Sequence, residues 1–213
     1  MKQFIILLVA IASICSAAYG QVEEGVSQSP AFQFDQEQLL SRFAALEPFK
    51  PEKGENDSGY AFVVTQEDFR NSLIFLSKEK IDEVMANFGN AVAFSFKNDT
   101  QFLMLTQWKD RESAQAFMKV ENELWRLKDE KYKQYIKKVV YKEIDVVKDE
   151  KALLTRKTLK QAEQKQEATT FVSARKNYFF ECTLIGGYTD SEVKKLILQI
   201  WKIVESEEKK GVR

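Results

Sequence analysis

The sequence predicts an α+β protein in which antiparallel strands carry amphipathic helices packed on one face of the sheet. Three observations predict this class. Apolar and polar residues alternate over most of 138–185, which is the period of a β-strand. Short polar connections separate these stretches, so neighbouring strands are expected to pair antiparallel. The segments 110–135 and 189–204 repeat apolar residues at helical spacing. The two halves, 60–147 and 148–213, therefore share a plan of strands followed by a helix, and a duplication would explain it.

Residues 1–20 have the composition of a cleavable secretory signal. Lys2 precedes the apolar run 4–15, and small residues follow it up to Gly20. The run is shorter than the roughly 20 apolar residues that a transmembrane helix needs. We therefore expect cleavage near Gly20, with cleavage after Ala18 as the alternative. The mature chain is expected to be periplasmic or secreted, without a transmembrane segment.

The stretch 21–59 is predicted to be a mobile N-terminus that contains one short helix and a linker. Asp35 has the position of a helix cap, because apolar residues recur at helical spacing after it. Pro48 and Pro51 end this helix, and 50–59 has the composition of a solvated linker.

The remaining residues, 60–213, are predicted to form the α+β domain. Its first half is expected to contain, in order, a strand at 60–65, a helix capped by Thr65, a helix from Ser77 to Gly89, a hairpin of 92–96 and 102–108, and a helix at 110–135. Its second half is expected to contain strands at 138–147, 152–160, 168–175 and 178–185, followed by a helix that Thr189 and Glu192 begin with a capping box.

The composition excludes several classes of function. Lys plus Arg and Asp plus Glu balance at 32 each, so the basic excess typical of nucleic-acid binders is missing. The sequence contains no histidine, the commonest general base and metal ligand. Once Cys15 leaves with the signal, Cys182 is the last thiol, which excludes an intrachain disulfide and, with no histidine, a zinc site built from His and Cys. We therefore expect no catalytic residue, no metal, no cofactor and no nucleic-acid partner.

The first half, 60–147, has the element order of a ferredoxin-like fold. Within it, the segment 102–117 (FLMLTQWKDRESAQAF) resembles the strand-to-helix segment of small ferredoxin-like monooxygenases that dimerise into α/β barrels. The resemblance implies this local topology and a homodimer. An enzyme or carrier of this kind would need a cavity lined by Trp108, Phe94 and Met104. A tryptophan packed at a sheet edge explains the same residues and is the favoured interpretation.

Basic residues outnumber acidic ones between 126 and 165. Strand periodicity places Lys138 and Lys142 on one face and Arg156 and Lys160 on one face. Such a surface suits an anionic partner, but a solvated sheet face that lysines protect from aggregation has the same composition. The acids and lysines at 121–131 are expected to lie on a solvated helix face for the same reason.

The sequence thus predicts a non-catalytic exported module that binds an unknown protein or an anionic ligand. Its candidate binding residues are the four basic residues Lys138, Lys142, Arg156 and Lys160, with Trp108 as the aromatic candidate. The alternatives are an enzyme or small-ligand carrier on a ferredoxin-like scaffold, and a basic-faced protein that associates with anionic envelope surfaces.

Overall fold

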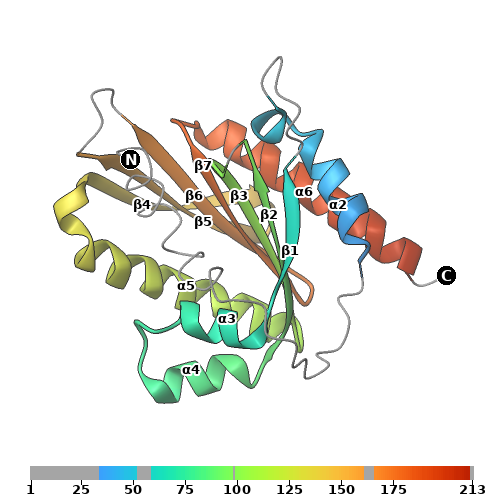
Figure 1. Ribbon diagram of the computed structural model, residues 1–213, viewed down its shortest axis with the longest axis horizontal. Coiled ribbons are helices and arrows are strands. Elements are labelled where there is room, and N and C mark those ends of the chain that lie inside the picture. The colour runs from blue at the N-terminus through green and yellow to red at the C-terminus, as the bar shows by residue number, and fades with distance from the viewer. Residues whose placement is uncertain (1–33, 52–58, 98, 161–165, 212–213) are drawn as a thin grey trace.

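Seven antiparallel strands form a single sheet in the order β1-β2-β3-β7-β6-β5-β4, with helices on both of its faces (Figure 1). The computed structural model describes residues 34–51, 59–97, 99–160 and 166–211. The predicted signal lies outside them. The α+β class and the antiparallel sheet that the sequence predicts are confirmed.

The elements follow one another along the chain as α2 (Gln36–Ala44), η1 (Glu47–Phe49), β1 (Tyr60–Val64), α3 (Gln66–Ser72), α4 (Lys78–Met85), β2 (Phe88–Phe96), β3 (Gln101–Trp108), α5 (Arg111–Lys131), η2 (Lys133–Tyr135), β4 (Ile136–Val147), β5 (Glu150–Leu159), β6 (Glu167–Arg175), β7 (Tyr178–Ile185) and α6 (Asp190–Gly211).

Side-chain caps begin the helices where the sequence predicts them. Asp35 accepts a hydrogen bond from the backbone of α2, and Thr65 forms a capping box with Asp68 at α3. Thr189 and Glu192 do the same for α6. The last four strands match their predicted bounds to within two residues. Local sequence rules therefore decide where most elements begin.

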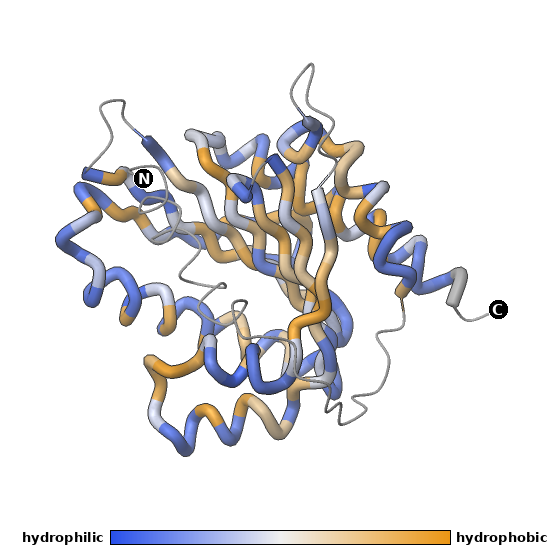
Figure 2. Tube along the Cα trace, viewed as in Figure 1, coloured by the Kyte–Doolittle hydropathy of each residue, from blue (hydrophilic) through white to orange (hydrophobic). Residues whose placement is uncertain are grey.

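Helices cover both faces of the sheet, whereas the sequence analysis expected them on one face. On one side α2 and α6 pack against the sheet through a core that includes Phe94, Phe180 and Trp201. On the other side α3, α4 and α5 pack through a core that includes Phe117 and Phe179. The reason is that β2, β3 and β7 carry apolar side chains on both faces, so both faces have to be shielded from water. Figure 2 shows the apolar residues concentrated along these strands.

The ferredoxin-like arrangement predicted for the first half is wrong, although the order of elements is as expected. β1 pairs antiparallel with β2 at one edge of the sheet, and β4 pairs with β5 at the other edge. A 21-residue α5 rises about 30 Å, enough to cross the roughly 20 Å occupied by the strands between β3 and β4. β3 and β7 then join the two halves into one sheet.

The helix expected from Ser77 to Gly89 ends at Met85. Phe88 instead begins β2 and stacks on Phe69 of α3, with ring centroids 4.0 Å apart. The short α2, which the sequence analysis assigned to the N-terminal stretch, packs on α6 and contributes to the same core.

Candidate functional site

The end of the sheet formed by β4 and β5 carries the basic residues that the sequence analysis singled out. Lys138, Val140 and Lys142 alternate along β4 and therefore point to the same face. Arg156 on β5 lies directly opposite Val140 in the register of the two strands. Lys138 and Lys142 are exposed, and Val140 is 40% exposed between them. We call these four residues the β4–β5 corner.

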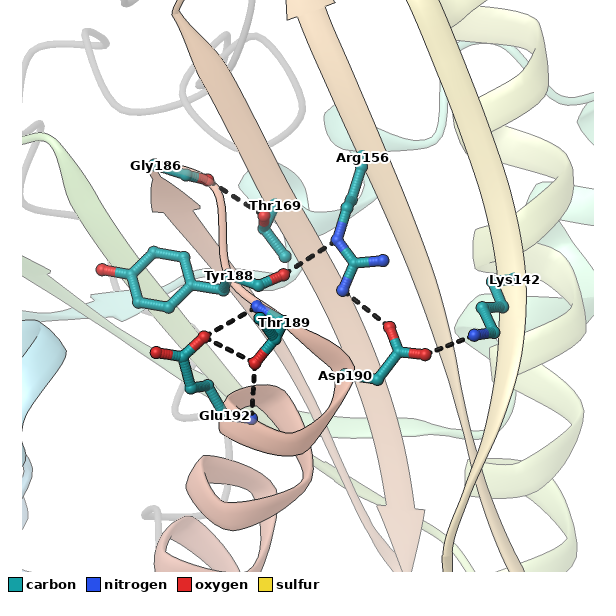
Figure 3. Close-up of polar contacts among 8 residues, drawn as sticks. All are labelled: Lys142, Arg156, Thr169, Gly186, Tyr188, Thr189, Asp190 and Glu192. Atoms are coloured by element: carbon teal, nitrogen blue, oxygen red, sulfur yellow. Dashed lines mark hydrogen bonds and ion pairs between the residues drawn. The ribbon is translucent and has the colours of Figure 1, made fainter.

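Asp190, in the first turn of α6, joins two members of the corner (Figure 3). Arg156 Nη2 donates to Asp190 Oδ1 over 2.7 Å, and Lys142 Nζ forms an ion pair with Oδ2. The hydrogen bonds from Lys142 and Arg156 lower the pKa of the Asp190 carboxyl below its ordinary value. Asp190 is therefore an internal counter-ion that sequence reasoning missed, because it treated this residue only as part of a helix start.

The segment between β7 and α6 fixes the place of this carboxylate. Thr169 Oγ1 donates to the Gly186 carbonyl over 3.0 Å, and Arg156 Nε donates to the Tyr188 carbonyl over 2.9 Å. Gly186 has a φ of +138°, a conformation that residues with a Cβ rarely adopt. At Gly187 a Cβ would lie 2.5 Å from Glu167 Oε2. The backbone before Asp190 is thus held on several sides, which keeps the corner and α6 in a fixed relation.

The other two predicted binding residues lie elsewhere. Lys160 follows the end of β5, and its Nζ donates to the Lys133 carbonyl in η2 over 3.1 Å. Trp108 is only 3% exposed and stacks on Phe117 of α5, with ring centroids 4.5 Å apart. Its Nε1 donates to Thr106 Oγ1 over 2.7 Å. Trp108 is therefore a core residue, and its ring offers no surface to a ligand.

The cavity proposed for a carrier or enzyme needs three side chains to share one space. Met104 and Trp108 belong to the core beneath α5, but Phe94 belongs to the core on the opposite face of the sheet. There, Phe94 packs edge-on against Phe43 of α2. The sheet therefore separates Phe94 from the other two residues.

A second group of polar residues lies beneath α5, where the sequence analysis expected a solvated helix face. Five charged side chains from α5, β5 and β7 are buried together and form what we call the polar cluster: Glu121, Lys128, Asp129, Lys157 and Glu181. The burial of two members could have been predicted from the sequence. Glu121 and Lys128 continue the apolar stripe of Phe117 and Leu124 at steps of three and four residues. Leu127, an apolar residue of the same helix, is in contrast 38% exposed.

Three members of the polar cluster, Lys157, Asp129 and Glu181, have polar contacts with each other or with neighbouring side chains. Lys157 Nζ lies 2.6 Å from Asp129 Oδ1, and the Tyr141 hydroxyl donates to Asp129 Oδ2 over 2.7 Å. Trp125 Nε1 donates to Glu181 Oε1 over 3.2 Å. Glu121 Oε1, in contrast, has no hydrogen-bond partner among the described residues.

Burial disfavours the ionised form of both glutamates in the polar cluster. Burial, and next to it the charge of Glu181, raise the pKa of Glu121 to about 8. Burial also raises the pKa of Glu181, although Lys128 and the Trp125 hydrogen bond act in the other direction. Glu121 is therefore protonated at neutral pH. Within the described ranges, no group of three or more acids and cysteines is placed to hold a metal ion.

Comparison with known proteins adds little to this geometry. No protein-family model matches the sequence, and no curated protein matches it. Among solved structures, the chain is similar to the crystal structure of the extracellular domain of PknH from Mycobacterium tuberculosis. The sequence identity is 14%, the TM-score is 0.37, and the match covers 68% of this chain and 78% of that chain. A likeness of this size identifies neither fold nor function.

Among the described residues, no helix combines the length and the apolarity that crossing a membrane requires.

Proposed function

We propose that the chain is an exported, non-catalytic module that binds an anionic partner at the β4–β5 corner. The observation that carries the proposal is the exposed pair Lys138 and Lys142, which flank the exposed Val140 on an edge strand. Cationic side chains around an apolar one favour a partner that presents both negative charge and apolar groups. The predicted signal at 1–20 supports export.

The coverage of the sheet supports this location. In the described part of the chain, helices pack on both faces of β2, β3 and β7 and bury most of their side chains. β4 is an edge strand, and its residues 138, 140 and 142 are exposed where its later residues Ile144 and Val146 are buried. A partner that approaches the sheet face next to α6 therefore meets the corner first.

Asp190 limits the strength of this site. Its carboxylate neutralises part of the charge of Lys142 and Arg156, so only part of the basic charge is available to a partner. A bound anion would have to compete with Asp190 for these two side chains. This arrangement predicts weak binding that depends strongly on ionic strength.

Asp190→Asn is expected to strengthen binding to vesicles that contain anionic lipid by roughly fivefold, because one charge near such a surface contributes about 1 kcal/mol. The measurement is co-sedimentation of the chain without residues 1–20, at low and at high salt. Asp145→Asn is the matched control, since Asp145 is exposed on the opposite face of β4 and its replacement changes net charge equally.

An anionic polysaccharide serves as a second probe and distinguishes a lipid surface from a soluble polymer. Equal gains for Asp190→Asn and Asp145→Asn would show that overall charge, and not the corner, governs binding. Binding of the unsubstituted chain to neutral vesicles as strongly as to anionic ones would also contradict the proposal.

A further inference from the structure

Acidic groups outnumber basic ones in the polar cluster. This imbalance makes the packing of α5 depend on a bound proton, which the binding proposal does not require. The cluster contains three carboxyl groups, Glu121, Asp129 and Glu181, and two ammonium groups, Lys128 and Lys157. With every group ionised, the cluster would carry one uncompensated negative charge between α5 and the sheet. One bound proton makes it neutral.

Glu121 is the carboxyl group that has to take this proton. Asp129 is compensated by Lys157 at 2.6 Å and accepts the Tyr141 hydroxyl hydrogen bond. Glu181 accepts the Trp125 indole hydrogen bond. Glu121 is 4% exposed, and its Oε1 has no hydrogen-bond partner among the described residues. If Glu121 is ionised, it loses hydration that Lys128, Lys157 and Trp125 replace only in part, so burial outweighs them and raises its pKa.

Among the described residues, Lys128 and Lys157 are the basic groups that act on the charge of Glu121, and both already belong to the polar cluster. On α5 the charged groups of the cluster are Lys128 and Asp129, on β5 Lys157 and on β7 Glu181. From β4 the facing titratable group is Tyr141, whose ring lies beneath the Arg126 guanidinium at 4.3 Å. From β6, which packs closely against α5, Thr170 and Val172 face the same side and do not titrate.

We infer that a proton on the Glu121 carboxyl holds α5 on the sheet, and that loss of this proton loosens α5 while α6 stays in place. The helix α5 covers one of the two cores together with α3 and α4, and α6 packs on the opposite face with other residues. The protonation state of the polar cluster thus controls how firmly a single helix packs on the sheet. Low pH stabilises the packing of α5, and high pH weakens it.

The direction follows from linkage. The pKa of Glu121 is raised from 4.5 to about 8 by folding, so between these values the folded chain holds a proton that the unfolded chain has lost. The stability that the proton on Glu121 contributes is fully present below the pKa of this group in the unfolded chain. It is lost as pH rises toward the pKa in the folded chain. Across that interval the equilibrium constant for opening α5 should rise by up to about tenfold per pH unit.

Amide hydrogen exchange of the full chain tests the inference, with α6 as an internal control. The ratio of exchange rates in α5 and α6 cancels the intrinsic effect of pH on exchange. We expect this ratio to rise between about pH 6 and about pH 8 in the unsubstituted chain. It should rise much less in Glu121→Gln, which imitates the protonated carboxyl and leaves only Glu181 with a raised pKa in the cluster. It should rise as before in Glu123→Gln on the exposed side of α5.

Carbon-detected NMR of glutamate carboxyl groups provides a second test that needs no variant. One glutamate carboxyl should titrate near pH 8 in the folded chain. If every glutamate carboxyl titrates below about pH 6, as ordinary ones do, the inference is overturned. An α5 to α6 exchange ratio that does not change with pH in the unsubstituted chain would overturn it as well.

Discussion

Asp129→Ala is expected to destabilise the fold by about 3–5 kcal/mol, because it leaves the Lys157 ammonium buried without its partner. The side chains of Lys157 and Asp129 are 11% and 7% exposed, so water cannot replace the lost carboxylate without opening the core. The substitution also removes the acceptor of the Tyr141 hydroxyl. Urea unfolding followed by circular dichroism measures the change in the free energy of unfolding.

The adjacent residue provides a matched control. Glu130 pairs with Lys133 on the surface of the same helix end, and both side chains are more than 70% exposed. Glu130→Ala should therefore cost less than about 1 kcal/mol. Equal losses for the two variants would show that the Asp129–Lys157 pair is hydrated and not buried. The double variant Asp129→Ala, Lys157→Met should recover part of the loss, since it no longer leaves the Lys157 ammonium buried without its partner.

Trp201→Ala should cost about 3–5 kcal/mol, a loss typical of removing a large aromatic side chain from a core. Trp201 is 1% exposed, its ring lies 4.9 Å from that of Phe180, and its Nε1 donates to Ser173 Oγ over 3.0 Å. The same unfolding measurement applies. Leu198→Ala on the same helix is the control, because Leu198 is 39% exposed and its removal leaves no closed cavity. A loss below about 1 kcal/mol for Trp201→Ala would contradict the packing of α6 on the sheet.

Sequence patterns predicted the elements well because their determinants are local. A cap such as Asp35 or Thr65 contacts backbone only three residues away, and such contacts can be seen in any sequence. Strand alternation likewise located β4 to β7. The pairing of β3 with β7 and the crossing of α5 to the far edge depend on residues distant in sequence, which periodicity does not encode.

Only part of the candidate site could be predicted, because strand periodicity is a local signal and one of its residues is distant in sequence. Lys142 and Arg156 were identified from strand periodicity, and the register of β4 and β5 does bring them to the same face. Asp190, which joins them, follows Lys142 by 48 residues and Arg156 by 34. The polar cluster was missed because charged residues on a helix are usually solvated, so the spacing of 121 and 128 along the apolar stripe was outweighed by their charge.

The most direct test of the proposed function is to remove the two exposed lysines of the corner and measure binding to anionic vesicles. Lys138→Gln with Lys142→Gln should weaken binding by roughly 30-fold at low salt, at about 1 kcal/mol for each charge. The control, Lys78→Gln with Lys119→Gln, removes two exposed lysines from α4 and α5 and should change binding by less than about threefold. If both pairs weaken binding equally, or neither does, the β4–β5 corner is not the binding surface.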